Sequence, residues 1–278
     1  MDDLVAAARQ KGAVAILVSG GRGLYRRMGC VDGGLYRTVT VARAAALPPV
    51  PGEVREWREE DVNGMAALYD CEPVRFLRGP EEFRAFLRTC RIECRPARTW
   101  VVRAPDGLAA YLCAAEPRKD APAHVLGIRE LAGSRRAALA AIPRVLAAHG
   151  AEQALVDALA ADTEMESLAA VFGLPVDPRG FQGTIRIIDG EGFTRAIEGL
   201  VRARAQAKPG PGLRISWDGD VVFRLGAEVF RAGGESELSV LAFGSLERQP
   251  PLPSPGPLRE ALTAVFPLPL VDYGLGYV

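Results

Sequence analysis

The chain has 278 residues, of which 49% are hydrophobic, and its 34 basic and 34 acidic residues give a formal net charge of +0. That balance leaves no electrostatic footprint for nucleic acid, and no apolar run is long enough to cross a bilayer. The sequence contains five cysteines, which is an odd number. It begins with Met-Asp-Asp and lacks the basic and apolar regions of a signal peptide. We therefore expect a cytoplasmic protein with reduced thiols, no nucleic-acid partner and no membrane.

The first segment predicts a helix, a strand, a glycine-rich turn and a second strand. Residues 2–8 have the apolar spacing of a helix, and residues 13–18 form a short apolar run typical of a buried strand. The glycines within 20–23 permit a sharp turn, after which Tyr25 begins a short helical turn that Gly29 ends. Residues 35–42 alternate and are rich in β-branched side chains, which predicts a strand. A proline-rich stretch then ends the segment.

Residues 53–189 predict a complete α+β unit with mixed order of elements. Strands are expected at 54–57, 99–103, 108–114, 125–131, 154–159 and 184–188. Helices are expected to start after three polar capping residues, Asp61, Ser134 and Thr163, and at the Gly79-Pro80 pair.

The last part of the chain, from Gly190 onward, predicts a smaller α+β unit. An amphipathic helix comes first, followed by a hairpin that turns at Asp218-Gly219 and a further strand. Residues 236–243 predict a helix, or a strand and a helix, and residues 258–266 predict another helix. The chain closes with an apolar tail that ends in Tyr277-Val278.

The strand, glycine turn and Tyr-x-x-x-Gly pattern around Tyr25 resembles the late part of a GNAT acyltransferase domain, and the element order of residues 53–189 resembles a whole one. With a third α+β part after them, the chain resembles the enhanced-intracellular-survival (Eis)-type acetyltransferases. The resemblance implies an α+β fold with a partial, N-terminally truncated GNAT unit at 1–46, a second GNAT-like domain at 53–189 and a sterol-carrier (SCP2)-like domain at 190–278.

The same resemblance implies a function, a cosubstrate and a set of site residues. The chain would move an acetyl group from acetyl-CoA to a primary amine on a small molecule or a peptide, and it would form a homo-oligomer. Tyr25 would be the general acid and the α-carboxylate of Val278 the general base, which requires 270–278 to run as an extended segment toward the 20–23 turn. Ser19, Gly21 and Gly23 would contact the cofactor, and no metal is implied.

One departure from the family keeps other functions open. The Arg/Gln-x-x-Gly-x-Gly/Ala loop that cradles the CoA pyrophosphate is missing from the first segment, and residues 130–136 of the second domain lack its spacing. The chain is alternatively a non-catalytic remnant or split-gene product that acts as a binding or scaffold module, or a carrier of an apolar ligand. In those cases Tyr25 would only pack beneath the strand–turn–helix connection, and the C-terminal tail would only anchor the last domain. We also expect the first segment to pack against the third domain, because half a sheet cannot bury its own apolar face.

Overall fold

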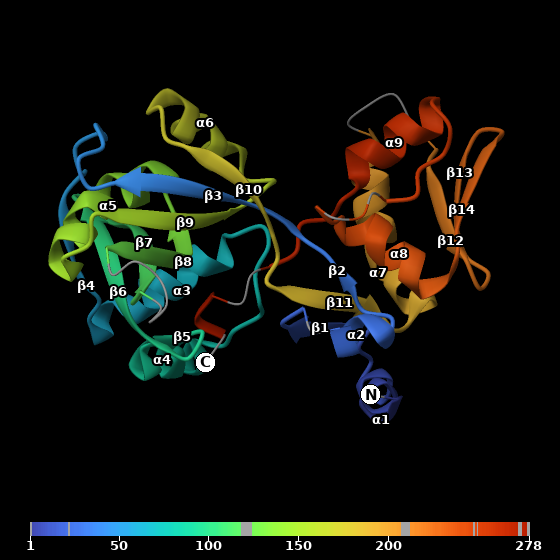
Figure 1. Ribbon diagram of the computed structural model, residues 1–278, viewed down its shortest axis with the longest axis horizontal. Coiled ribbons are helices and arrows are strands. Elements are labelled where there is room, and N and C mark those ends of the chain that lie inside the picture. Colours follow the sequence, from blue (N-terminus) through green and yellow to red (C-terminus); the bar gives the residue numbers. More distant parts are fainter. Residues whose placement is uncertain are drawn as a thin grey trace. The chain divides into compact units, whose positions relative to one another are not determined.

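The computed structural model describes residues 2–21, 23–117, 124–206, 212–246, 248, 250–271 and 274–276. The chain forms two compact units (Figure 1). Unit 1 contains Met1–Leu35 and Arg179–Leu270, and unit 2 contains Tyr36–Pro178 and Val271–Val278. Within the described ranges, no helix has the length and apolar character needed to span a membrane.

Unit 2 is built on one large sheet. Its strand order is β10–β3–β9–β8–β7–β6–β4, and β5 pairs with β6. β8 and β9 are parallel, whereas β3 with β9, β8 with β7, and β6 with its neighbours are antiparallel. The strands are β3 (Leu35–Ala42), β4 (Glu53–Glu56), β5 (Arg91–Ile92), β6 (Arg95–Ala104), β7 (Gly107–Ala115), β8 (Val125–Gly133), β9 (Gln153–Leu159) and β10 (Val176–Gly180).

Helices cover both faces of this sheet because both sets of alternating strand residues are apolar. On β7, Leu112 packs in the core beneath α5 (Arg135–His149) and α6 (Thr163–Val171). Its neighbour Tyr111 packs in the opposite core, with α3 (Val62–Asp70) and α4 (Pro80–Thr89). Two separate hydrophobic cores therefore hold the sheet between them.

Unit 1 contains two small sheets, each of three strands. One has the order β1–β11–β2 and the other the order β12–β13–β14. The strands are β1 (Ala15–Ser19), β2 (Val31–Asp32), β11 (Gly183–Ile187), β12 (Arg214–Trp217), β13 (Val221–Leu225) and β14 (Glu228–Ala232), and the helices are α1 (Asp2–Gln10), α2 (Gly23–Arg27), α7 (Gly190–Gln206), α8 (Gly234–Phe243) and α9 (Pro257–Val265).

The chain passes from one unit to the other twice, each time between two strands that are neighbours in the sequence. β3 follows β2 directly in sequence but lies between β9 and β10 in the sheet of unit 2. β11 follows β10 but lies between β1 and β2 in unit 1, with Ala15 opposite Ile187 and Ser19 opposite Gly183. The segments 1–46, 53–189 and 190–278 are thus distributed over both units, and their division into three domains stays a prediction.

Most predicted elements are confirmed, and β3 matches its predicted range at both ends. Ser134 caps α5 as expected, because its Oγ accepts a hydrogen bond from the N–H of Ala137 at 3.2 Å. The first segment pairs through β1 with β11, whose residues the prediction assigned to 53–189, and it contacts the third predicted part through the N–H of Gly34, which donates to the carbonyl oxygen of Phe243. Leu4 nevertheless remains 54% exposed, and the apolar side chains of β1 are only half-buried.

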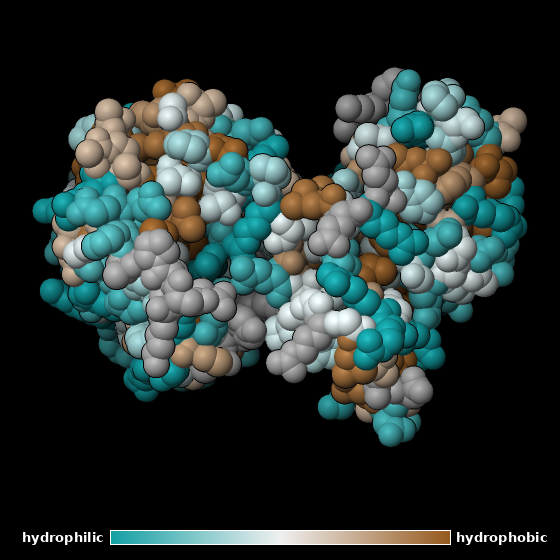
Figure 2. Space-filling model, in the orientation of Figure 1, coloured by the Kyte–Doolittle hydropathy of each residue, from teal (hydrophilic) through white to brown (hydrophobic). Residues whose placement is uncertain are grey.

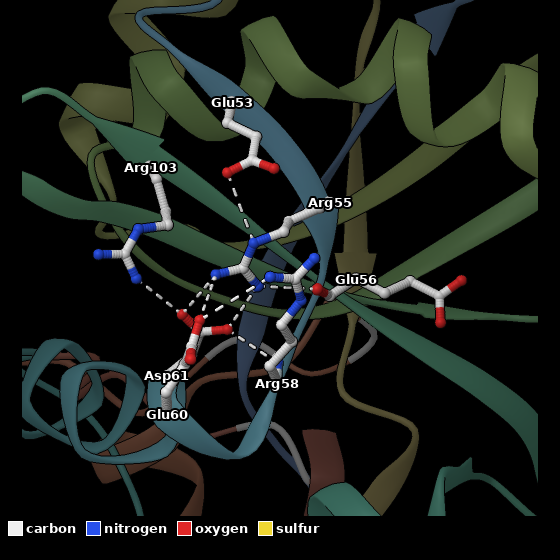
Figure 3. Close-up of polar contacts among 7 residues, drawn as sticks. All are labelled: Glu53, Arg55, Glu56, Arg58, Glu60, Asp61 and Arg103. Carbon is white, nitrogen blue, oxygen red and sulfur yellow. Dashed lines mark hydrogen bonds and ion pairs between the residues drawn. The ribbon is translucent and has the colours of Figure 1, made fainter.

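Several details differ from the prediction, and the structure decides one that the sequence left open. Asp61 stands at the start of α3, but its carboxylate binds Arg55, Arg103 and the N–H of Arg58 instead of the helix (Figure 3). Asp162, and not Thr163, caps α6, through the N–H of Met165 at 2.9 Å. β10 was not predicted, because Val176–Gly180 contains a proline and a glycine and little apolar alternation. Residues 236–243 lie in a single helix, α8.

Candidate functional site

The sheet of unit 2 opens between its two parallel strands. β8 and β9 pair from Val125 with Gln153 as far as Ile128 with Val156. Beyond that point β8 stays paired with β7, and β9 with β3. A β-bulge that leaves Arg129 without a partner on β7 coincides with the separation. We call residues 129–133 of β8 and 157–159 of β9 the fork.

A cavity of about 90 Å³ lies at the fork, and six of its fourteen described lining residues are charged. Sites for drug-sized molecules are usually three times larger or more, so the space suits a few waters or a very small ligand. The charged residues at the cavity form ion pairs: Arg129 with Asp157, Arg135 with Glu72 and Asp162, and Glu130 with Arg78.

Glu130 accepts four hydrogen bonds, and its side chain is only 7% exposed. Its Oε1 accepts hydrogen bonds from Tyr111 Oη at 2.8 Å and from Arg78 at 3.1 Å. Its Oε2 accepts from Arg78 at 3.0 Å and from the backbone N–H of Leu275 at 2.9 Å. The Arg78 guanidinium also lies 4.4 Å from the centre of the Tyr69 ring. The carboxylate thus joins β7, β8, the segment before α4 and the tail.

These contacts shift the proton equilibria around Glu130. Burial, followed by the negative charge of Glu130, raises the pKa of Tyr111 well above its ordinary value. Burial alone lowers the pKa of Arg78, but Glu130 more than offsets that effect and the net pKa is raised. At neutral pH Tyr111 is therefore a fixed hydrogen-bond donor and Arg78 a fixed cation, and both donate to Glu130.

The N-terminus of α5 is where an anion such as a pyrophosphate binds most readily, because free N–H groups and the helix dipole meet there. In this chain the carboxylate of Glu72 lies at that end, accepting from the N–H of Gly133 at 3.0 Å and from Arg135 at 2.7 Å. Asp162 accepts a hydrogen bond from Arg135 at 2.7 Å, and the Oγ of Ser134 accepts one from the N–H of Ala137. The residues at the N-terminus of α5, beside the fork, therefore do not fit the pyrophosphate of acyl-CoA.

The predicted site residues on the glycine turn all belong to unit 1. Tyr25 is half-buried on α2, and its carbonyl oxygen accepts from the N–H groups of Met28 and Cys30, both at 3.0 Å. Ser19 is the exposed last residue of β1, while Gly21 and Gly23 flank the start of α2 on the surface. Val278, together with Tyr273 and Tyr277, lies outside the described residues, so the structure does not place the predicted base.

A hollow of about 500 Å³ lies beside α2 in unit 1. Arg26 and Asp32 line it and form a two-pronged ion pair at 3.0 and 2.9 Å. Cys30 also lines it, and burial raises the pKa of its thiol, so that this cysteine is protonated and a poor nucleophile at neutral pH. The hollow has the size of a ligand site, unlike the cavity of the fork.

A backbone contact from β11 holds the end of α2 in place. Arg186 donates to the carbonyl oxygen of Met28 at 2.8 Å, and the next residue, Gly29, has a positive φ of 82° that ends the helix. Sequence reasoning found Gly29 but missed Arg186, because nothing in the sequence indicates that β11 enters this sheet. In the part of the chain that the structure describes, no group of three or more His, Cys, Asp or Glu residues could hold a metal ion.

The architecture of the chain is the mixed α/β fold of the GNAT acyltransferases. Eis1 from Mycobacterium abscessus is similar over 98% of this chain and 75% of its own, with a TM-score of 0.56 and 16% identity. GCN5-related N-acetyltransferases from Anabaena variabilis and Kribbella flavida are each similar over 86% of this chain, with TM-scores of 0.53 and 0.52 and identities of 11% and 14%. The chain spans 65% and 64% of their lengths. No family model matches the sequence, and no curated protein matches it.

Proposed function

We propose that the protein is an acyl-CoA-dependent N-acyltransferase that moves an acetyl group from acetyl-CoA to a primary amine on a small molecule or a peptide. One observation carries the proposal: the similarity to Eis1 extends over 98% of this chain, and the strand–turn–helix that bears Tyr25 lies beside a hollow of ligand size. The N-terminus of α5 in unit 2 does not fit the pyrophosphate of acyl-CoA, which favours unit 1 as the location of the chemistry.

The proposed roles follow from what acyl transfer to an amine requires. Acetyl-CoA would supply an activated acyl group as its thioester. The amine must lose a proton, which the α-carboxylate of Val278 would accept, and the departing thiolate must gain one, which the phenol of Tyr25 would donate. Ser19, Gly21 and Gly23 would approach the cofactor with their backbone, since the two glycines have no side chain to obstruct it.

Calorimetric titration with acetyl-CoA, followed by an assay with a panel of primary amines, tests this function. We expect measurable binding at or below millimolar cofactor, and transfer to at least one amine. Tyr25→Phe removes only the hydroxyl and should keep cofactor binding while transfer falls by about 100-fold, the usual contribution of a general acid. Leu77→Ala, at a 90% exposed position in unit 2, is the control and should retain both. No binding heat at millimolar acetyl-CoA would refute the proposal.

A second candidate is a non-catalytic binding or scaffold module. The internal ion pairs at the N-terminus of α5 favour it, because the chain's own carboxylates stand where a working GNAT domain binds the pyrophosphate. This alternative predicts that neither the wild-type protein nor Leu77→Ala binds acetyl-CoA, although both remain folded by circular dichroism.

A further inference from the structure

A groove of about 600 Å³ runs along one edge of the second sheet of unit 1. The consecutive residues 212–216, which lead into β12 and form most of it, all line this groove. Because successive side chains of a strand point to opposite faces of the sheet, a hollow along the edge of the strand is what meets such a run of neighbours. The opposite wall is α7, which contributes Glu198, Arg202 and Ala205 from one side of the helix. The groove thus lies between a helix and the edge strand of a sheet.

The backbone of β12 is available to a further strand. Within the described part of the chain β12 pairs only with β13, from Arg214 with Arg224 to Trp217 with Val221, so the N–H and C=O groups of its outer edge have no strand partner. Addition of an extended peptide to a sheet edge is a recurrent mode of recognition, in which main-chain hydrogen bonds supply the affinity. The four residues of β12 span about 13 Å, and the groove has the volume of a ligand site, so a peptide of about five residues fits.

The charges of the groove select an acidic occupant. Arg214 and Arg224 are exposed and lie directly opposite each other on β12 and β13, an arrangement of like charges that destabilises a sheet. Neither arginine forms an ion pair with any described residue, whereas Arg202 is paired with Glu198 at 2.7 Å. Three arginines and one glutamate therefore line the groove of a chain whose formal net charge is zero. Carboxylates placed between Arg214 and Arg224 would remove their repulsion.

We propose that the groove between α7 and β12 binds an extended acidic segment of a partner protein, which pairs with β12 as a fourth strand of the sheet. The side chains of β12 also specify a pattern. Leu213 and Ile215 are buried, while Arg214 and Ser216 between and after them are exposed. An added strand follows the same alternation, so it should carry an acidic residue at every second position and an apolar residue between. The arginines also disfavour β12 of a second copy, because like charges would then face each other. This inference does not depend on the proposed acyl transfer.

The test uses the full-length protein and a fluorescein-labelled peptide, Glu-Val-Glu-Val-Glu with both ends blocked, followed by fluorescence anisotropy at low salt. We expect the peptide to bind, and the same peptide with lysine in place of glutamate to bind at least tenfold more weakly. Two further peptides are N-methylated, one at positions 1, 3 and 5 and the other at positions 2 and 4. The N–H groups of an extended strand alternate between its two edges, so one of these peptides should lose at least tenfold in affinity and the other should stay within threefold. Hydrogen exchange of residues 214–217 should slow at least tenfold with the bound peptide.

The double variant Arg214→Gln with Arg224→Gln should bind the acidic peptide at least tenfold more weakly and with a smaller dependence on salt. Arg259→Gln removes an exposed arginine from α9, outside the groove, and is the matched control, expected within twofold of wild type. No binding of the acidic peptide at millimolar concentration overturns the proposal, as does binding that leaves hydrogen exchange of β12 unchanged. Equal binding of both N-methylated peptides, or full displacement by millimolar inorganic phosphate, would reveal a simple anion site and would also overturn it.

Discussion

The carboxylate of Asp61 is fully buried and links the start of α3 to two strands (Figure 3). It accepts hydrogen bonds from Arg55 on β4 at 2.6 and 3.0 Å and from Arg103 on β6 at 2.9 Å. Burial by itself raises the pKa of Asp61, but the bonds from Arg55, the N–H of Arg58 and Arg103 outweigh it, so that the net pKa lies below its ordinary value.

Asp61→Asn should therefore lower the free energy of unfolding at neutral pH by about 2 to 3 kcal/mol, the range for hydrogen bonds to charged groups. A carboxylate whose pKa is lowered by folding stabilises the native state above its unfolded pKa, and that stability is lost as the pH falls below about 4. The variant should consequently lose less stability than wild type in acid. Urea unfolding at pH 7 and pH 3 measures both effects, and Asp106→Asn, in the exposed β6–β7 turn, should change neither. Equal losses on acidification in the variant and wild type would contradict this role.

At the scale of single residues, the sequence indicated which residues have a structural role better than it indicated which residues they bond to. Asp61 was predicted as a helix cap because an aspartate before an apolar helical pattern usually is one. Its actual partner Arg103 lies 42 residues further along the chain and carries no local signal. Arg78 and Glu130 were missed as a pair for the same reason, since 52 residues separate them.

Among the elements, α5 and α6 are joined at their N-terminal ends by the side chain of Asp162. Asp162 caps α6 through Oδ1 and accepts from Arg135, the first residue of α5, through Oδ2. Thr163, the cap expected from sequence, is exposed and is already inside the helix. The helix cap is therefore Asp162, whereas the sequence pattern predicted its neighbour Thr163.

Asp162→Ala should lower the free energy of unfolding by about 1 to 2 kcal/mol, because it leaves the N–H of Met165 without its acceptor. Thr163→Ala should change it by less than about 0.5 kcal/mol, as is usual for a surface position. Thermal unfolding of the two variants beside wild type decides between them. A larger effect from Thr163→Ala would show that the cap lies where the sequence pattern placed it.

The fork shows why element prediction does not extend to the site. The range of β8 was predicted well, but simple alternation places Glu130 on the same face as Leu126 and Ile128, against α5. The bulge at Arg129 shifts the alternation by one residue, so Glu130 instead faces Tyr111 and the tail. A bulge depends on the partner strand, and the sequence of β8 alone does not specify it.

For the whole molecule, the sequence predicted the order of elements but not that successive strands, such as β2 and β3, belong to different sheets. The alternation of β3 identifies it as a strand but does not specify which strands it pairs with. Its pairing with β9, and that of β11 with β1, depends on contacts more than 100 residues apart in the chain. The α+β class and the GNAT-like fold could be predicted from sequence because they follow from element order, which is a local property.

The last prediction concerns assembly. Unit 1 exposes hydrophobic surface in the region of α1 and α2, where Figure 2 shows brown atoms, and Leu4 and Leu24 there are 54% and 52% exposed. Among the described strands, β1 pairs only with β11, so its other edge presents unpaired N–H and C=O groups. A second copy of the chain would cover both features, and we expect a homo-oligomer.

Light scattering at micromolar concentration should give a mass of at least two chains, where one chain is 29.7 kDa. The double variant Leu4→Asp with Leu24→Asp places charges on the exposed face and should shift the mass toward a single chain. Leu77→Asp, at a 90% exposed position in unit 2, serves as the control and should leave the mass unchanged. A wild-type mass of one chain would contradict the prediction, whereas loss of the oligomer only with Leu77→Asp would place the interface on unit 2 instead.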